Sequence, residues 1–478
     1  MQTLRGTLVD TPQLGALRIR RDHVICVSLV LVLVADAGVD ACGVISSIAP
    51  ASATTPALLA SATPLPRHTF LLPPFADLHL HAPQYLNAGS GLDLPLMEWL
   101  DAYTYPAEER VDADPALAAK LYTRLAQRLL EAGTGAALFF GTIGVEANLI
   151  LAKACQDAGV RGYIGKLSMD QSPRSTYGEA SPAESLANLH AFLDSMATLT
   201  SPLAPHERLV QPVLTPRFVP VCSDALLSSL GALAAERNLM IQSHMCESRD
   251  QMAWVHATRG RKDEHVFDTA CLLTPRTVQA HVTSLTPNLV GLIKERGVTV
   301  AHCPLSNAYF SDAAFPLREA LDAGVKIGLG SDIAGGYALP VQAAMRNAVL
   351  VARLREGAKR EATFTAAAGA EPAVKDGEGI AEPDECSLRV DWTESLYLAT
   401  AGGRAALGLP GTFRVSAPFD AQQITLAGDD GPLGLIDFFD LPCEDADDTW
   451  WRDAIERWWC VGDDRNRTGM WVQGRRVR

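Results

Sequence analysis

Residues Pro73–His81 read PPFADLHLH, and this segment decides how the rest of the chain is interpreted. Its apolar residues and opening prolines predict a short buried strand. Side chains two residues apart on a strand point to the same face, so the imidazoles of His79 and His81 lie side by side. Two neutral imidazoles at a strand end suit a divalent metal such as zinc. An isolated His-X-His also occurs on ordinary sheet surfaces, so other motifs must support a metal site.

The composition is that of an ordinary globular protein. The chain has 478 residues, 48% hydrophobic and 20% charged, which is enough for one large α/β domain and a smaller one. Its formal net charge of −14 argues against a nucleic acid or an anionic membrane as partner and favours a small-molecule substrate. The ten cysteines include no Cys-X-X-Cys pair, which excludes zinc ribbons and cytidine-deaminase-type enzymes. Because they form no disulfide scaffold, we expect a cytoplasmic location.

An apolar run at Val24–Ala35 follows a basic segment and so resembles a signal anchor. It spans only 12 residues, whereas a membrane helix needs about 20. Its valines and isoleucine favour strands. We therefore predict buried β-structure here and no membrane segment.

From Pro73 onward, apolar strand-like segments alternate with helical patterns rich in Leu and Ala. The expected strands are Phe75–His81, Ala136–Thr142, Gly162–Met169, Leu209–Thr215, Leu239–His244, Val278–Val282, Val298–His302 and Val325–Asp332. The clearest helical patterns are Pro115–Ala132, Ala183–Ala197, Asp224–Glu236 and Phe315–Ala323. Eight such alternations predict an α/β fold, a (β/α)8 TIM barrel whose functional side chains lie at the C-terminal strand ends.

The flanking segments predict a small composite β-sandwich. Residues 1–72 contain short β-like pieces and a Ser/Ala/Thr/Pro-rich linker at Pro50–Pro66, and residues 409–478 return to β-like pieces. We expect these two parts to join in one domain beside the barrel, which occupies residues 73–408. Within the barrel, residues 357–390 have no apolar period and are expected to be an exposed, disordered insertion.

Three later strand ends carry side chains suited to metal-assisted chemistry. His244 can supply a third nitrogen ligand, and Glu247, just beyond it, can shuttle protons. His281, at the end of the sixth strand, is a candidate for polarising a bound water or the substrate. Asp332 ends the eighth strand and offers an oxygen ligand or a base, whereas His302 on the seventh is assigned a structural role. Each motif alone is weak, but their joint position at barrel strand ends supports one site.

These motifs resemble the amidohydrolase superfamily and, within it, the guanine deaminase family. The resemblance covers most of the barrel. It is carried by His79–Tyr85, Gly91–Leu100, Pro216–Phe218, Gln242–Glu247, His302–Asn307 and Gly328–Gly336. The His-X-His is shared by many amidohydrolases, whereas His-Ala-Pro-Gln and the Arg-Phe pair are more specific.

The resemblance implies a zinc-dependent hydrolytic deamination of guanine to xanthine and ammonia in purine catabolism. It implies one Zn²⁺ per subunit, a homodimer, Glu247 as proton shuttle and His281 as the residue that orients the attacking oxygen. The implied metal ligands are His79, His81, His244 and Asp332, the last of which also takes part in proton transfer.

The purine is implied to contact Gln84, Arg217 and Phe218. Arg217 can donate to the carbonyl oxygen of the six-membered ring, Gln84 offers a donor and an acceptor, and Phe218 can pack against the base. The other substrate contacts that we expect are His81, His244, Glu247 and Asp332.

Three alternatives remain open. A related deaminase or chlorohydrolase acting on another aromatic heterocycle shares the metal motifs and differs only in the purine contacts. A dinuclear hydrolase needs a carbamylated lysine, but Lys166 lies on the third expected strand rather than the fourth. A non-catalytic scaffold of the same fold is less consistent with intact ligands and an intact Glu247.

Overall fold

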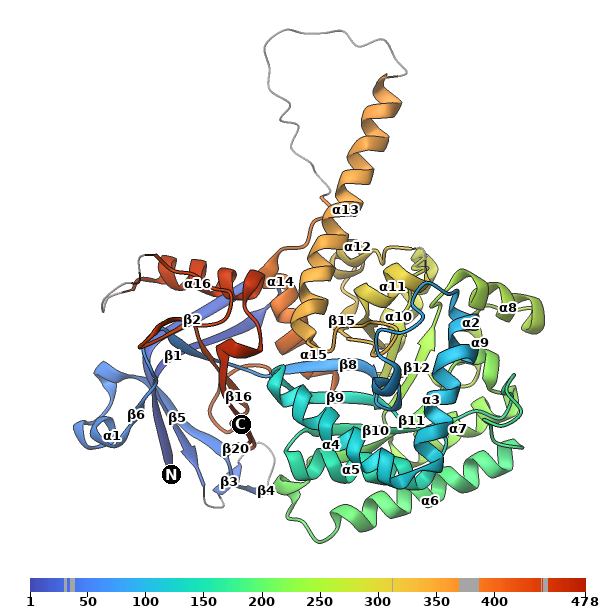
Figure 1. Ribbon diagram of the computed structural model, residues 1–478, viewed down its shortest axis with the longest axis horizontal. Coiled ribbons are helices and arrows are strands. Elements are labelled where there is room, and N and C mark those ends of the chain that lie inside the picture. The colour runs from blue at the N-terminus through green and yellow to red at the C-terminus, as the bar shows by residue number, and fades with distance from the viewer. Residues whose placement is uncertain (30–31, 35–38, 312, 369–386, 440, 442–445) are drawn as a thin grey trace.

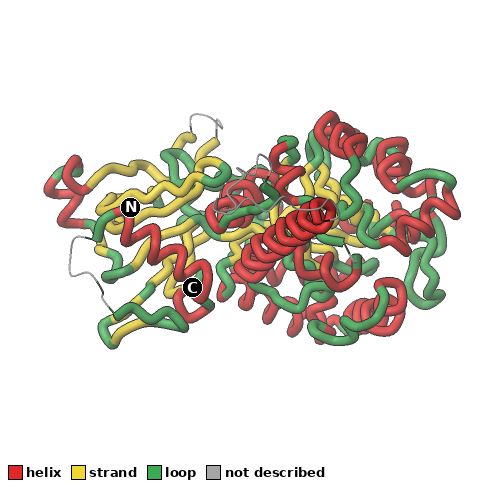
Figure 2. The backbone as a smooth tube through the Cα atoms, turned by 90° about the horizontal axis from the view of Figure 1, so that it is seen from above, coloured by secondary structure: helices red, strands yellow, loops and turns green. Residues whose placement is uncertain are grey.

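Two large sheets organise the chain in this computed structural model (Figure 1). The residues that the structure describes are 1–29, 32–34, 39–311, 313–368, 387–439, 441 and 446–478. One sheet is the parallel barrel, and the other is built from the two terminal segments. Viewed from above, the strands of the two sheets occupy neighbouring regions (Figure 2).

The barrel consists of eight parallel strands in sequential order. They are β8 (Phe75–His81), β9 (Thr134–Phe140), β10 (Arg161–Ser168), β11 (Val210–Pro216), β12 (Ile241–Met245), β13 (Thr277–His281), β14 (Thr299–His302) and β15 (Lys326–Leu329). Each expected strand overlaps one of them, so the predicted (β/α)8 barrel is confirmed. Most of these strands are buried along their whole length, as parallel strands covered by helices must be.

The segment after β15 closes the barrel against β8. The backbone N–H of Asp332 donates to the carbonyl of His79 over 2.8 Å, and the N–H of His81 donates to that of Ile333 over 2.8 Å. The Asp77 carboxylate supports this junction, because its Oδ1 accepts the N–H of Ser331 over 3.0 Å. Closure therefore places the carboxylate of the last strand end beside the histidines of the first.

Helices cover the outside of the barrel (Figure 1). They include α4 (Pro115–Glu131), α5 (Val145–Ala158), α6 (Pro182–Thr200), α7 (Asp224–Arg237), α8 (Arg249–Arg259), α9 (Asp263–Thr269), α10 (Pro287–Arg296), α11 (Pro304–Phe310) and α12 (Leu317–Asp322). Their starts follow capping rules: Asp114 accepts the N–H groups of Ala116 and Leu117, each over 3.0 Å, ahead of Pro115. All four helices expected from periodicity are present.

Between β8 and α4 lies a helical segment that periodicity did not predict. Helix α2 (Leu96–Trp99) continues through a π-helical turn (Leu100–Thr104) into α3 (Tyr105–Ala113). Near the C-terminal boundary of the barrel, α14 (Trp392–Tyr397), a second π-helical turn (Leu398–Gly402) and α15 (Gly403–Ala406) form a continuous helical segment.

The terminal segments share one eight-stranded sheet. Its strands, in spatial order, are β20 (Arg475–Arg476), β19 (Arg467–Val472), β16 (Ala421–Thr425), β7 (Thr69–Leu72), β1 (Gln2–Gln13), β2 (Ala16–Ser28) and β5 (Val44–Pro50), with β6 (Thr63–Pro64) paired to β1. Strand β16 pairs antiparallel with β7, so the expected union of the N- and C-terminal parts is confirmed. Helix α16 (Asp448–Val461) packs on this sheet through Trp458, whose ring meets Phe70 edge-on at 5.6 Å. Two small hairpins, β3 (Val32–Val34) with β4 (Val39–Ala41) and β17 (Ala427–Gly428) with β18 (Gly431–Pro432), complete the strands.

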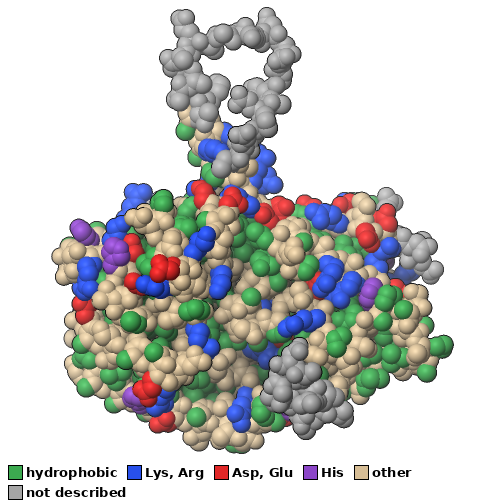
Figure 3. Space-filling model, turned by 180° about the vertical axis from the view of Figure 1, so that it is seen from behind, with side chains coloured by type: hydrophobic (Ala, Val, Ile, Leu, Met, Phe, Trp, Pro, Cys, Tyr) green, Lys and Arg blue, Asp and Glu red, His purple; other side chains and the backbone are tan. Residues whose placement is uncertain are grey.

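Two parts of the sequence form more structure than expected. The linker at Pro50–Pro66 contains a 3-10 turn, helix α1 (Pro56–Ser61) and β6, because Thr55 caps a helix that begins with a proline. Residues 357–368 of the expected insertion are the end of α13 (Val341–Ala368), which projects from the body of the molecule (Figures 1 and 3). Alanine, lysine, arginine and glutamate favour a helix even without an apolar period.

Residues 369–386, where disorder was expected, lie outside the described part of the chain. The apolar run from Val24 contributes Val24–Val27 to β2, where all four side chains are buried. None of the described helices is long and apolar enough to cross a membrane. The domain boundaries at residues 72 and 408 stay predictions.

Candidate active site

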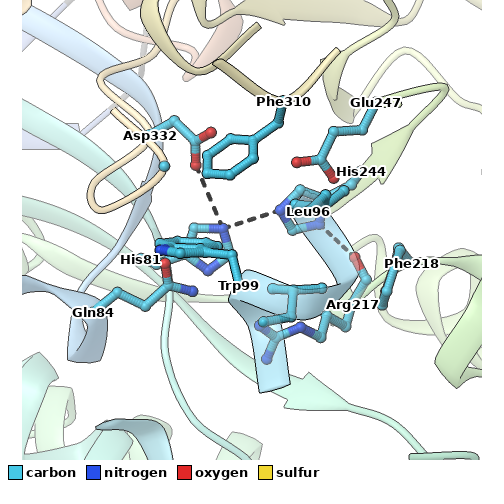
Figure 4. Close-up of a pocket in the computed structure, with 12 residues that line it drawn as sticks. His81, Gln84, Leu96, Trp99, Arg217, Phe218, His244, Glu247, Phe310 and Asp332 are labelled. Carbon is cyan, nitrogen blue, oxygen red and sulfur yellow. Dashed lines mark hydrogen bonds and ion pairs between the residues drawn. The ribbon is translucent and has the colours of Figure 1, made fainter. Parts of the chain in front are cut away.

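A pocket opens at the C-terminal ends of the barrel strands (Figure 4). It is lined by His81, Gln84, Leu96, Trp99, Leu100, Arg217, Phe218, His244, Glu247, Phe310, Asp332 and Gly335. Seven of these are site residues expected from the sequence. The other two expected residues, His79 and His281, are buried beside the pocket. Their Nε2 atoms lie near the carboxylate of Asp332, which lines it. The structure thus brings all nine to one end of the barrel.

Three histidines and one aspartate converge in this pocket. The Nε2 atoms of His81 and His244 are 3.0 Å apart. Oδ1 of Asp332 lies 3.1 Å from Nε2 of His79 and 3.7 Å from Nε2 of His81. These side chains come from β8, β12 and the segment after β15, so three separate strand ends supply the cluster.

Hydrogen bonds behind the cluster fix the imidazole tautomers. Nδ1 of His244 lies 2.6 Å from the carbonyl oxygen of Arg217, which can only accept. Nδ1 of His281 lies 2.9 Å from Oδ1 of Asn307, another acceptor. Both Nδ1 atoms therefore carry the proton, and both Nε2 atoms are left with a lone pair directed into the site.

The cluster leaves nitrogen atoms without hydrogen-bond partners. Among the described residues, Nε2 of His79 and of His281 are buried and accept no hydrogen bond. Nε2 of His79 is close to Asp332, but the pair lacks hydrogen-bond geometry. Buried polar atoms are normally paired, so these two nitrogen atoms fit the chemistry of a metal-binding site.

Burial shifts the pKa values of the ionisable side chains in the site. It lowers the pKa of His79, His81, His244 and His281, so these imidazoles are neutral at pH 7. Burial, together with the nearby Asp332, raises the pKa of Glu247 well above its usual range. Neutral imidazoles are the form that binds metals.

The donor set fits a divalent metal ion. His79, His244 and His281 offer ligand atoms within 4.8 Å of one another, as do Glu247, His281 and Asp332. Imidazole nitrogen and carboxylate oxygen are the ligands of catalytic zinc sites. The geometry also argues against a bridging lysine, because Nζ of Lys166 is bound to Glu179 over 2.7 Å.

The backbone of the site is strained at several strand ends. Cys246, His281 and Asp332 have φ values of 51°, 70° and 50°, in the left-handed region that non-glycine residues avoid. Such conformations cluster where surrounding structure must aim side chains. His302, assigned a structural role, is buried and stacks on Phe315 at 4.8 Å.

Residues that sequence reasoning did not single out line the pocket or hold the side chains that do. Glu108 of α3 binds both Gln84 and Arg217, and Asn307 orients His281. Trp99 and Phe310 form an apolar wall, with ring centroids 5.0 Å apart. Asn307 ends a segment that resembles the family, whereas Glu108 lies outside those segments, and a lone acid or amide in a helix gives no periodic signal.

Comparisons with known proteins agree with the geometry. The sequence model of the Amidohydrolase family matches residues 70–371. The chain belongs to the amidohydrolase family. This amidohydrolase is 36% identical over 420 residues to the guanine deaminase of Homo sapiens, covering 86% of this chain and 84% of the relative. It is 33% identical over 417 residues to the guanine deaminase of Dictyostelium discoideum, covering 86% and 82%.

A solved structure extends the likeness to the whole amidohydrolase chain. A guanine deaminase from C. acetobutylicum, with guanine bound in its active site, has a TM-score of 0.80 and 26% identity and covers 100% of both chains. The terminal sheet is therefore part of the shared architecture, beside the barrel.

Proposed function

We propose that this amidohydrolase hydrolyses guanine to xanthine and ammonia with one bound Zn²⁺. The observation that carries the proposal is the presence, in one pocket, of the histidine–aspartate cluster beside the side-chain donors of Gln84 and Arg217. The guanine deaminases among its relatives support the choice of substrate.

The proposed ligands of the zinc are His79, His81, His244 and Asp332. A bound zinc ion acts as a Lewis acid and makes a hydrolytic nucleophile available at neutral pH. The hydrogen bond from His244 to the Arg217 carbonyl keeps Nε2 of His244 unprotonated for this role.

Glu247 moves protons in this proposal. Its carboxylate lies 3.6 Å from Nε2 of His281, and burial, together with the nearby Asp332, raises its pKa, which makes the carboxylate a stronger proton acceptor. Its backbone is held on both sides: the N–H donates to Oε1 of Gln251 over 2.8 Å, and the carbonyl accepts from Thr283 over 3.2 Å. A fixed carboxyl can take the proton of the attacking water and deliver it to the amine that leaves C2.

His281 and Asp332 orient the attacking oxygen. Nε2 of His281 lies 3.8 Å from Oδ2 of Asp332, so an imidazole and a carboxylate face the same point. Asn307 holds the imidazole in one tautomer. The pair can therefore take the second proton of the attacking water as its oxygen bonds to C2. That proton ends on ring N3 of xanthine when the C2–N bond breaks and ammonia leaves.

The rest of the pocket binds the purine ring. Arg217 and Gln84 can donate to the C6 carbonyl, and Phe218 lies near His244 with ring centroids 6.2 Å apart. Trp99 and the apolar side chains beside it exclude water from the ring. A homodimer and a cytoplasmic location are part of the same proposal and rest on family likeness and composition.

A substrate panel tests the proposal against the alternative heterocycles. Zinc-loaded protein is incubated with guanine, melamine and a chlorotriazine, and the products are separated chromatographically. Xanthine from guanine, with the triazines unchanged, is expected. Turnover of a triazine in place of guanine would replace the proposed substrate.

A further inference from the structure

Glu108 contacts Gln84 and Arg217, the two proposed donors to the C6 carbonyl of guanine, although it does not line the pocket itself. Its Oε1 accepts from Nε2 of Gln84 over 2.9 Å and from Nη2 of Arg217 over 3.0 Å. Its Oε2 accepts from Nη1 of Arg217. Glu108 and Arg217 are both buried, so water cannot replace either partner.

The carboxylate fixes which way the amide of Gln84 points. A carboxylate only accepts, so the NH₂ group of Gln84 must face Glu108. On the other side, the Gln84 oxygen accepts the backbone N–H of Ala334 over 3.2 Å. A reversed amide would set two acceptors against each other at Glu108 and two donors against each other at Ala334. One N–H and one lone pair of Gln84 remain free.

The same carboxylate fixes the plane of Arg217. Its two bonds to Glu108 form a bidentate pair, which holds the guanidinium in one orientation. The ring of Tyr105 lies 4.9 Å from the guanidinium carbon and supports that plane. Two of the five N–H groups are used on Glu108, and the other three can point elsewhere.

We propose that Glu108 is a positioning residue that makes the pocket select purines with a carbonyl at C6. This inference rests on the proposed function. By orienting the free N–H groups of Gln84 and Arg217 together, Glu108 presents donors where the carbonyl oxygen of guanine binds. Without Glu108 only the N–H of Ala334 holds the amide of Gln84, and the guanidinium of Arg217 loses its bidentate partner, so the preference for an acceptor at C6 weakens.

Direct binding of two purines without a C2 amine tests this role. Hypoxanthine carries the C6 carbonyl and purine carries hydrogen there. Calorimetry on the zinc-loaded protein is expected to show that the wild type prefers hypoxanthine. In Glu108→Gln, hypoxanthine binding is expected to weaken about 30-fold, because charge-assisted donors are misplaced, and purine binding less than about 3-fold.

Matched variants separate positioning from general stability. Glu109→Gln removes the neighbouring acid, which pairs with Arg174 over 2.8 Å outside the pocket, and is expected to keep the wild-type ratio. Glu108→Asp keeps the charge but shortens the side chain, and it serves if Glu108→Gln does not fold. It is expected to lower the ratio while zinc content stays at one per chain.

Equal weakening of both purines in a folded, zinc-loaded Glu108 variant would overturn the positioning role, since lost stability affects both ligands alike. An unchanged ratio, or a wild type without preference, would overturn it as well. Guanine turnover by the wild type is measured in parallel. Its absence contradicts the proposed function and removes this inference with it, whereas turnover with an unchanged binding ratio contradicts the inference alone.

Discussion

Nε2 of His81 and Nε2 of His244 lie 3.0 Å apart, although the two residues are separated by 163 positions in the sequence. The Nδ1 proton of His244 is committed to the Arg217 carbonyl, so its Nε2 carries a lone pair toward His81. Two imidazoles that bind the same metal ion must be neutral and must bring their nitrogen atoms this close together.

Replacing one of these imidazoles should remove the metal. His244→Ala deletes a proposed ligand, and we expect zinc per chain, measured by atomic emission after gel filtration, to fall from about one to well below half. His265→Ala changes an exposed histidine on α9 and should retain the wild-type zinc content. A His244→Ala protein that still holds one zinc would exclude His244 as a ligand.

Asn307 should affect turnover without affecting metal content. Asn307→Leu removes the acceptor that fixes the tautomer of His281, so we expect kcat for guanine to fall about 10- to 100-fold. Zinc content and KM should change little, because Asn307 is not a proposed ligand and does not line the pocket. Unchanged kcat would show that His281 does not depend on this hydrogen bond.

Acid should destabilise the protein through Asp420. Burial alone would raise the pKa of this carboxyl, but Arg161 and Arg404 outweigh it and hold the pKa well below its usual range. A pKa lower in the folded than in the unfolded state gives stability that is complete above about pH 4, the unfolded value, and is lost as the pH falls below it.

Calorimetry of Asp420→Asn across pH 3–8 measures this contribution. We expect a lower Tm at pH 7, because two buried arginines lose their partner at a cost of about 3–5 kcal/mol. The loss of Tm below pH 4 should be shallower than in the wild type. Parallel Tm curves over the whole range would assign the acid sensitivity to other carboxyls.

The C-terminal helix should contribute to stability through Trp458. This buried ring lies edge-on to Phe70 and stacks on Phe75 at 6.4 Å, which joins α16 to β7 and β8. Trp458→Ala is expected to lower the free energy of unfolding by about 3–5 kcal/mol. Trp254→Ala, at a partly exposed site on α8, should cost less than about 1 kcal/mol in the same chemical denaturation.

The barrel could be predicted from sequence because its strands are short, apolar and buried on both faces. Phe75–His81 has the same bounds in the structure as in the prediction. The clustering of the candidate side chains followed, because barrel strand ends meet at one rim and the first, fifth, sixth and eighth of them carry such side chains. The closure of the barrel, in which the N–H of Asp332 donates to the His79 carbonyl, could not be predicted. It depends on the register between the first and last strands, which the pattern of apolar residues does not specify.

Other features could not be predicted because no local pattern specifies them. Glu108 lies 109 residues from Arg217, and only the fold places them in contact. The end of α13 lacks an apolar period and projects from the body of the molecule, yet its composition favours a helix. The Ser/Ala/Thr/Pro-rich composition at Pro50–Pro66 predicts a linker, but Thr and Pro also start helices, as Thr55 and Pro56 do for α1.

Guanine turnover by the wild type and by Glu247→Gln tests the central claim most directly. Both proteins are purified with quantified zinc, and the conversion of guanine to xanthine is followed by ultraviolet absorbance. We expect one zinc per chain in both, turnover by the wild type, and a loss of at least about 100-fold in kcat for the variant, which cannot carry the proton. Zinc-loaded wild-type protein that leaves guanine unchanged, or a Glu247→Gln protein with wild-type kcat, would contradict the account.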